Sequence, residues 1–231
     1  MRNIAVLAIL AFMPIIAVGK SGGMEKENYL IATSVNNSDI GDSLSFLGMA
    51  RFPAAKYGGI SLLAHTSEFN GKKNYIDSSS KGLRLDVFLR KYDLGIIQVG
   101  YGYSEKEHDF LSSTDTHTID THSLNGTYYI DKFDVSLSFL TGENDDGDSF
   151  DISNFGAGYF VNKNLQTRIL IGGMDADGNN TIAISYQPEI FGNTAAVSAS
   201  YDDTKLDNSF RFSVEYYFNT KVSFVDRVRK Y

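Results

Sequence analysis

The chain has 231 residues with 28 acidic and 21 basic side chains, which give a net charge of −7, and it contains no cysteine or tryptophan. The lack of cysteine excludes disulfide bonds and thiolate metal sites. The acidic balance argues against nucleic acid as a partner, because binding phosphates requires a basic surface.

The N-terminus has the features of a secretory signal peptide. Arg2 supplies a positive charge, Ile4 to Val18 form an apolar core, and Ala17-Val18-Gly19 is a small-x-small cleavage site. A single membrane anchor fits less well, because the apolar run is about 15 residues and a spanning helix needs ~20. We therefore expect residues 1–19 to be removed. No later apolar run approaches the length of a spanning helix.

From Tyr29 onward, segments of alternating apolar and polar residues recur about every 16 residues, with turn-forming clusters between them. A strand sends successive side chains to opposite faces, so each segment predicts a strand with one apolar face. The first eleven apolar faces are Tyr29-Ile31-Thr33-Val35, Leu44-Phe46-Gly48-Ala50-Phe52, Ile60-Leu62-Ala64, Leu83-Leu85-Val87-Leu89, Ile97-Val99-Tyr101-Tyr103, Leu124-Gly126-Tyr128-Ile130, Phe133-Val135-Leu137-Phe139, Phe155-Ala157-Tyr159-Val161, Leu165-Thr167-Ile169-Ile171, Ile182-Ile184-Tyr186 and Ala195-Val197-Ala199-Tyr201.

The connections between these segments alternate in length, as expected for a bacterial barrel with short periplasmic turns and longer extracellular loops. The short set is Pro53–Gly58, Lys91–Asp93, Asp131–Lys132, Asn162–Asn164 and Gln187–Asn193. The longer, polar set is Asn36–Asp42, Asn70–Ser80, Glu105–Asp115, Gly142–Asp148, Asp175–Asn180 and Asp202–Asn208.

The last segment, Phe210 to Phe218, has aromatic or apolar residues at every second position and Arg211, Ser213, Glu215 and Tyr217 between them. This strand resembles the aromatic-ended terminal strand of Gram-negative outer-membrane proteins, which serves in that family as the barrel-assembly signal. The resemblance implies a bacterial outer-membrane location, contact with outer-membrane lipid and lipopolysaccharide, and recognition by the barrel-assembly machinery.

One departure from the family concerns the end of the chain. The aromatic residue is usually last, whereas here Asn219 to Tyr231 follow it. We expect a periplasmic C-terminal extension, because Asp226-Arg227-Val228-Arg229-Lys230 breaks the alternation. The alternative is that Lys221 to Tyr231, which also ends in an aromatic residue, takes part in the assembly signal.

These patterns predict an all-β, single-domain, transmembrane antiparallel up-and-down β-barrel of about 12 strands. It covers residues 20–218, between the signal peptide 1–19 and the extension 219–231. Ten or fourteen strands remain open, because each strand signal is weak by itself. A soluble sandwich would also alternate, but the signal peptide, the loop pattern and aromatic residues near strand ends favour the barrel. The aromatic residues expected in interfacial girdles are Tyr101, Tyr103, Tyr128, Phe133, Tyr159, Tyr186, Tyr201, Tyr216 and Phe218.

Several charged residues fall on the inward face of the predicted strands. Burying charges in a dry core is costly unless they are paired, so they imply either an aqueous lumen or an ion-paired interior. We expect a porin-like channel for passive diffusion of small hydrophilic solutes or ions; the alternative is a structural or adhesive barrel without an open pore. Inward Ser and Gly residues leave room for water. The predicted pore-lining residues are Arg51, Arg84, Asp86, Arg90, Asp134, Arg168, Arg211 and Glu215.

Other candidate chemistry is weaker. Asn144–Asp148 and Asp175–Asn179 resemble calcium loops, but neither completes the pattern with its distal Glu. We interpret them as solvated acidic loops. His65, His108, His117 and His122 show no metal-ligand spacing. There is no G-x-S-x-G motif, and His65 and Ser67 face inward. The sequence therefore predicts no cofactor, no metal site and no enzymatic activity.

Overall fold

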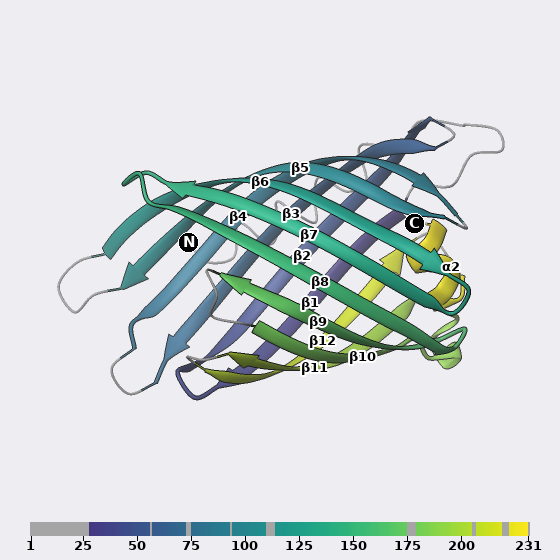
Figure 1. Cartoon of the computed structure of the whole chain (residues 1–231). Helices are drawn as coiled ribbons and strands as arrows, with labels where there is room; N and C mark the ends of the chain where they lie inside the picture. Colours follow the sequence, from purple (N-terminus) through teal and green to yellow (C-terminus); the bar gives the residue numbers. More distant parts are fainter. Residues whose placement is uncertain are drawn as a thin grey trace.

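The computed structural model describes residues 28–55, 57–72, 75–92, 94–109, 114–174, 179–204, 207–218 and 222–230. The expected signal peptide, residues 175–178 of the second acidic loop, and residues 219–221 and 231 of the C-terminal extension lie outside these ranges. Twelve strands form one closed barrel, with a short helix at one mouth (Figure 1).

The strands occupy most of the described residues. Their bounds are β1 Asn28–Ser38, β2 Gly41–Ala55, β3 Gly58–Gly71, β4 Asp77–Lys91, β5 Gly95–Asp109, β6 Thr114–Ile130, β7 Phe133–Asn144, β8 Ser149–Asn162, β9 Leu165–Met174, β10 Asn179–Tyr186, β11 Ala195–Thr204 and β12 Asn208–Phe218. The helical elements are the 3-10 turn η1, Glu189–Phe191, and the helix α2, Phe224–Lys230.

Every strand pairs antiparallel with its neighbours in the sequence, and β1 closes the barrel against β12. The closing register runs from Tyr29 opposite Phe218 to Ser38 opposite Ser209. Closure pairs every strand on both sides and leaves no exposed sheet edge. The predicted fold class, up-and-down order and strand number are confirmed.

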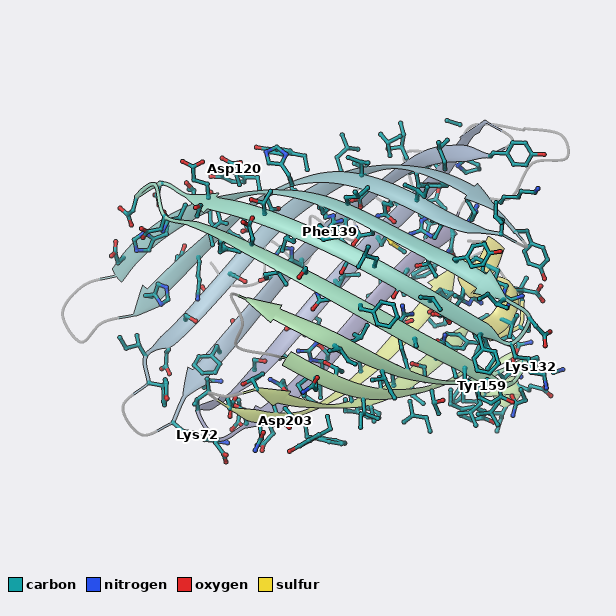
Figure 2. All side chains as sticks on the ribbon, viewed as in Figure 1. Lys72, Asp120, Lys132, Phe139, Tyr159 and Asp203 are labelled. Carbon is teal, nitrogen blue, oxygen red and sulfur yellow. The ribbon has the colours of Figure 1, made fainter. Side chains whose placement is uncertain are left out.

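The outer face of the barrel is apolar because the period-two pattern sends the apolar residues outward. On β4, Leu83 and Leu89 are more than 60% exposed, whereas Asp86 and Phe88 between them are 2% exposed. The other strands follow the same alternation in the register expected from the sequence. Phe139 illustrates it midway along the wall (Figure 2).

Outward aromatic residues gather near both ends of the strands. At the end that carries the five turns β2/β3, β4/β5, β6/β7, β8/β9 and β10/β11 (the turn end), the rings of Phe133 and Tyr159 lie 4.9 Å apart and those of Tyr216 and Phe218 lie 4.8 Å apart. On the side of the apolar belt that faces the opposite mouth (the loop end), Tyr101 lies against His122 with ring centroids 5.4 Å apart. Two aromatic girdles are the arrangement that membrane interfaces favour.

The connections at the loop end are shorter than the sequence predicted. The polar residues assigned to loops continue the strands instead, so that β5 reaches Asp109 and β6 begins at Thr114. Backbone pairing does not require apolar side chains, and the ladders therefore extend beyond the apolar belt. Their outward residues are then polar, as in the contact of Lys81 Nζ with Glu105 Oε2 at 2.7 Å.

The C-terminal segment does not continue as a strand. Ser223 caps α2: its Oγ accepts a hydrogen bond from the backbone N–H of Asp226 at 3.2 Å and donates one to the Asp226 carboxylate at 2.7 Å. α2 folds back into the turn end of the barrel (Figure 1). Among the described residues, no helix is both long and apolar enough to cross a membrane.

Candidate functional site: the barrel interior

The eight residues predicted to line the lumen all face the barrel interior, because they lie on the strand face opposite the exposed apolar residues. The structure places them in two groups. Arg84, Asp86, Asp134, Arg168 and Arg211 take part in polar contacts along the wall. Arg51, Arg90 and Glu215 lie beside aromatic side chains closer to the turn end.

The first wall contact, which we call the β4–β6 bridge, consists of Arg84, Asp86, Gly100 and Ser123. Asp86, Gly100 and Ser123 lie side by side in one row across β4, β5 and β6. Arg84 donates from Nε to Asp86 Oδ1 at 2.7 Å and from Nη2 to Ser123 Oγ at 2.6 Å. The guanidinium therefore lies along the wall, and Arg84 keeps 27% of its side chain exposed.

The second contact, the β7–β9 bridge, repeats this construction with Asp134, Gly158, Gln166 and Arg168. Asp134, Gly158 and Arg168 form a row across β7, β8 and β9. Asp134 accepts a hydrogen bond from Gln166 Nε2 at 2.6 Å, and its other oxygen lies 3.4 Å from Arg168 Nη1. Arg168 also donates to the hydroxyl of Ser136. Asp134 is fully buried beneath these partners.

The glycine at the centre of each row makes this arrangement sterically feasible. A Cβ atom on Gly100 would collide with Asp86, and one on Gly158 would collide with Asp134 and Gln166. Because the central residue has no side chain, the charged groups can lie flat against the wall instead of projecting across the lumen. Both bridges therefore place an arginine beside a buried carboxylate and leave the middle of the barrel polar.

Two other charged residues that were predicted to line the lumen, Arg211 and Glu215, take no part in the bridges. Arg211 Nη2 lies 3.8 Å from Asp202 Oδ2, and 52% of the Arg211 side chain is exposed. The sequence had assigned Asp202 to a loop, but β11 continues to Thr204 and turns Asp202 inward. The carboxylate of Glu215 accepts a hydrogen bond from the hydroxyl of Tyr217.

Toward the turn end, the interior changes from polar to aromatic. Phe88, Tyr129, Phe160 and Tyr217 are each less than 7% exposed, and we call these four side chains the aromatic floor. The guanidiniums of Arg51 and Arg90 lie 5.2 and 5.3 Å from the ring centroid of Phe88. Such cation–π contacts allow arginine to remain in a layer of low polarity.

The helix α2 lies across the turn-end mouth, against the floor. Phe224 is 7% exposed and packs in one cluster with Leu30 of β1, Phe160 of β8, Ala196 of β11 and Tyr217 of β12. Side chains of β2 pack against the same cluster. This cluster gathers side chains of β1, β2, β8, β11 and β12 around Phe224, so α2 lies over the opening.

Polar contacts from four of the five turns hold α2 in this place. Arg227 stacks on the Tyr217 ring at 3.6 Å and donates to Gln187 Oε1 at 3.0 Å and to the Asn193 carbonyl at 2.6 Å. The other contacts are Tyr92 Oη to Asp226 Oδ1 at 3.1 Å, Tyr129 Oη to the Val228 carbonyl at 3.0 Å, Arg229 to the Asp131 carbonyl, and Val225 N–H to the Lys163 carbonyl at 3.0 Å.

Sequence reasoning missed the floor and the helix, although a signal for both was present. Phe88, Tyr129, Phe160 and Tyr217 each occupy an inward position near the turn end of their strands. An aromatic residue at an inward position is unusual for a strand with an otherwise polar lumen face. Repeated in four strands, it indicates that aromatic side chains narrow the lumen at that level.

A separate polar cluster lies at the loop end, beyond the outer girdle. The ring of His117 has Asp115 Oδ2 3.2 Å from Nε2, and Asp146 Oδ2 and Asp145 Oδ1 at 3.0 and 3.4 Å from Nδ1. Partial burial favours the neutral ring, but the carboxylates of Asp115, Asp146 and Asp145 outweigh it and raise the pKa of His117. The sequence showed no metal-ligand spacing around His117 and indicated a solvated acidic loop at Asn144–Asp148; the fold brings the two together.

The other residues considered from the sequence have ordinary surroundings. His65 and Ser67 face the interior, and the Ser67 and Ser80 hydroxyls are 2.8 Å apart and share a hydrogen bond. His122 faces outward against Tyr101. Within the described ranges, His117, Asp145 and Asp146 are the one group of three side chains whose ligand-type atoms all lie within 4.8 Å of one another.

Comparison with known proteins identifies the fold. No protein-family model matches the chain, and no curated protein matches its sequence. Solved structures match over most of its length. The KdgM porin in complex with disordered oligogalacturonate has a TM-score of 0.64 at 14% identity, covering 81% of this chain and 98% of that one.

Two further solved β-barrel structures also match this chain. The COG4313 outer membrane channel from Pseudomonas putida F1 has a TM-score of 0.58 at 10% identity, covering 90% of this chain and 100% of that one. The translocator domain of the autotransporter NalP from Neisseria meningitidis has a TM-score of 0.55 at 10% identity, covering 93% and 95%. The fold is that of outer-membrane β-barrels. At these identities the likeness describes the architecture alone.

Proposed function

We propose that this protein is a porin-like channel of the bacterial outer membrane, through which small hydrophilic solutes or ions diffuse passively. The observation that carries the proposal is the polar interior, whose charged side chains lie flat over Gly100 and Gly158. A barrel of twelve strands is wider than the smallest barrels, which fill with side chains. The likeness to porins and channels supports the same function.

We further propose a role for each segment of the chain and the partners that the barrel contacts in the membrane. Residues 1–19 are the signal peptide, residues 20–218 the barrel, and residues 219–231 a periplasmic segment. The pore-lining residues are Arg51, Arg84, Asp86, Arg90, Asp134, Arg168, Arg211 and Glu215, and the activity is transport without catalysis. The apolar belt contacts outer-membrane lipid, the polar rim at the loop end contacts lipopolysaccharide, and the barrel-assembly machinery inserts the protein.

Conductance of the purified protein in planar lipid bilayers tests the proposal. Discrete current steps in potassium chloride, over a range of voltages of both signs, are the expected result. A folded, inserted barrel that passes no current at any voltage would contradict it.

A second candidate, a structural or adhesive barrel without an open pore, is favoured by the aromatic floor and by α2 across the turn-end mouth. Proteoliposome swelling in small sugars separates the two candidates. A channel admits the sugar and the vesicles swell, whereas a closed barrel leaves them unchanged.

A further inference from the structure

The turn-end mouth is obstructed by a segment whose covalent link to the barrel is the end of β12. The helix α2 begins six residues after Phe218, the last residue of the barrel. The twelve strands close the barrel by pairing with one another and not with α2, so its departure would not require any strand to unpair.

The contacts that hold α2 are of kinds that water can replace. Phe224 is its single fully buried apolar anchor, and Val225 and Val228 are only partly buried. The other contacts are hydrogen bonds to turn carbonyls and side chains, together with arginine–aromatic stacking. Ordering seven helical residues costs conformational entropy, which lowers the net stability that Phe224 and the polar contacts give to the docked helix.

The segment is also positively charged. Residues 221–230 contain Lys221, Arg227, Arg229 and Lys230 against the single acidic residue Asp226. A transmembrane potential therefore acts on the segment, and a potential of one sign pulls it out of the mouth whereas the opposite sign pushes it in.

From these observations we propose that α2 is a displaceable plug, so that the barrel is a gated channel and conducts when the C-terminal helix leaves the turn-end mouth. This inference rests on the proposed channel function. In the closed state, Phe224 seals against Phe160 and Tyr217, and Arg227 bridges Tyr217 to the β10/β11 turn. In the open state, the polar interior with its two bridges is continuous with the solvent at both ends.

A reversible cross-link tests the plug in the full-length protein. Val225 N–H donates to the Lys163 carbonyl at 3.0 Å, so the two backbones lie side by side at this point, as a disulfide between two cysteines requires. The chain has no cysteine of its own, so K163C/V225C carries a single thiol pair. We expect the oxidised protein to stay closed and the reduced protein to pass about tenfold more current, as when a blocked pore opens.

K163C alone is the matched control, and its current should not respond to the reductant. A second variant, F224A/R227Q, weakens both anchors without a cross-link and should conduct more than the unmodified protein. The unmodified protein should open at one sign of voltage and close at the other.

The outcomes separate the plug from the channel itself. Equal currents from oxidised and reduced K163C/V225C, with no increase in F224A/R227Q, would overturn the plug while leaving the channel in place. No current from any folded variant at either sign of voltage would overturn both, because the aromatic floor would then close the barrel by itself.

Discussion

At the scale of single residues, the inward glycines decide how charge is accommodated inside the barrel. Gly100 and Gly158 each lie between two strands whose inward side chains belong to one bridge. A side chain at either position would force the carboxylate to swing into the lumen or to lose its hydrogen bonds. Gly126, which faces outward on β6, has open space around it instead.

This contrast gives the first prediction. Gly158→Ala should lower the free energy of unfolding by about 1–3 kcal/mol, because the added methyl group displaces Asp134 and Gln166 from a fully packed site. Gly126→Ala is the matched control and should be neutral or slightly stabilising, because its methyl group meets no neighbour. Denaturant unfolding of the two variants in lipid vesicles is the measurement. Equal effects of the two substitutions would show that the β7–β9 bridge does not depend on its glycine.

The second prediction concerns the orientation of β4. Leu85→Arg or Val87→Arg should destabilise the barrel by about 2–4 kcal/mol, because each places a charge among lipid chains. An inward substitution should cost much less. Asp86 is a poor inward control, since it is buried against Arg84, so Gln98→Arg on the inner face of β5 is the better choice. Comparable losses at Leu85 and Gln98 would contradict the assignment of the two faces.

At the scale of elements, the attachment of the β7/β8 loop to β6 depends on the charge of His117. The pKa of His117 is raised above its ordinary value of 6.5, so the protonated ring stabilises the folded contact. That contribution is complete below about pH 6.5 and is lost as the pH rises through the higher pKa of the folded state. Its neighbour His108 behaves oppositely: burial, Lys106 and His117 lower the pKa of His108.

The third prediction follows from the raised pKa of His117. Amide exchange in the loop around Asp145 and Asp146 should accelerate as the pH is raised from 6.5, beyond the intrinsic rise in exchange rate. His117→Gln should remove that extra acceleration, because the side chain of Gln is neutral and its charge does not change with pH. NMR titration of the His117 ring provides the second measurement. A midpoint at or below 6.5 would show that the three carboxylates do not stabilise the imidazolium.

The fourth prediction concerns the last strand and the segment after it. A chain that ends at Phe218 should still assemble, because β12 closes the barrel through its pairing with β1 and β11 and does not need α2. Phe218→Ala should impair assembly, because we expect the aromatic end of β12 to be the assembly signal, by its resemblance to the terminal strand of Gram-negative outer-membrane proteins. The heat-dependent shift in gel migration that folded barrels show measures both. Failure of the truncation together with normal assembly of Phe218→Ala would move the signal to Tyr231.

At the scale of the whole molecule, the balance of interior charge is closer to neutral than the sequence predicted. The inward count from the sequence was five arginines against three carboxylates, but Asp202 also turns inward and lies beside Arg211. Two of the remaining arginines are engaged with Asp86 and Asp134 in the bridges. The excess of positive charge is concentrated near the aromatic floor, at Arg51 and Arg90, and the acidic excess of the chain lies mainly outside the lumen.

The fifth prediction is therefore a weak anion preference of the open pore at high salt. Fixed charges in a narrow aqueous pore enrich counter-ions, whereas the acidic residues at the loop end are screened within ~8 Å at physiological salt. At low salt the preference should shrink or reverse. Reversal potentials across a potassium chloride gradient measure it. Clear cation selectivity at high salt that is unchanged in Arg84→Ala and Arg168→Ala would show that these two side chains do not line the pore.

The sequence by itself determined the class of this protein and the face on which each strand residue lies. Alternation on β4 and β12 is a local property of the chain, because successive side chains must point to opposite faces of a strand. The strand number came from counting such segments. The charged residues that were predicted to line the lumen all face inward for the same reason. A shift of one residue in the register of a strand would turn every side chain of that strand to the opposite face.

Only the tertiary structure decided which inward residues meet. The two bridges join three strands each, and the partners of Asp134 are 32 and 34 residues away in the chain, so their contacts depend on the stagger between strands. The loops were predicted too long because backbone pairing continues through polar residues such as those of β5 and β6. The closing of the turn end by α2 depends on the packing of Phe224 with Phe160 of β8 and Tyr217 of β12. These two strands are four apart in the sheet, and the curvature of the closed barrel brings their side chains into one cluster.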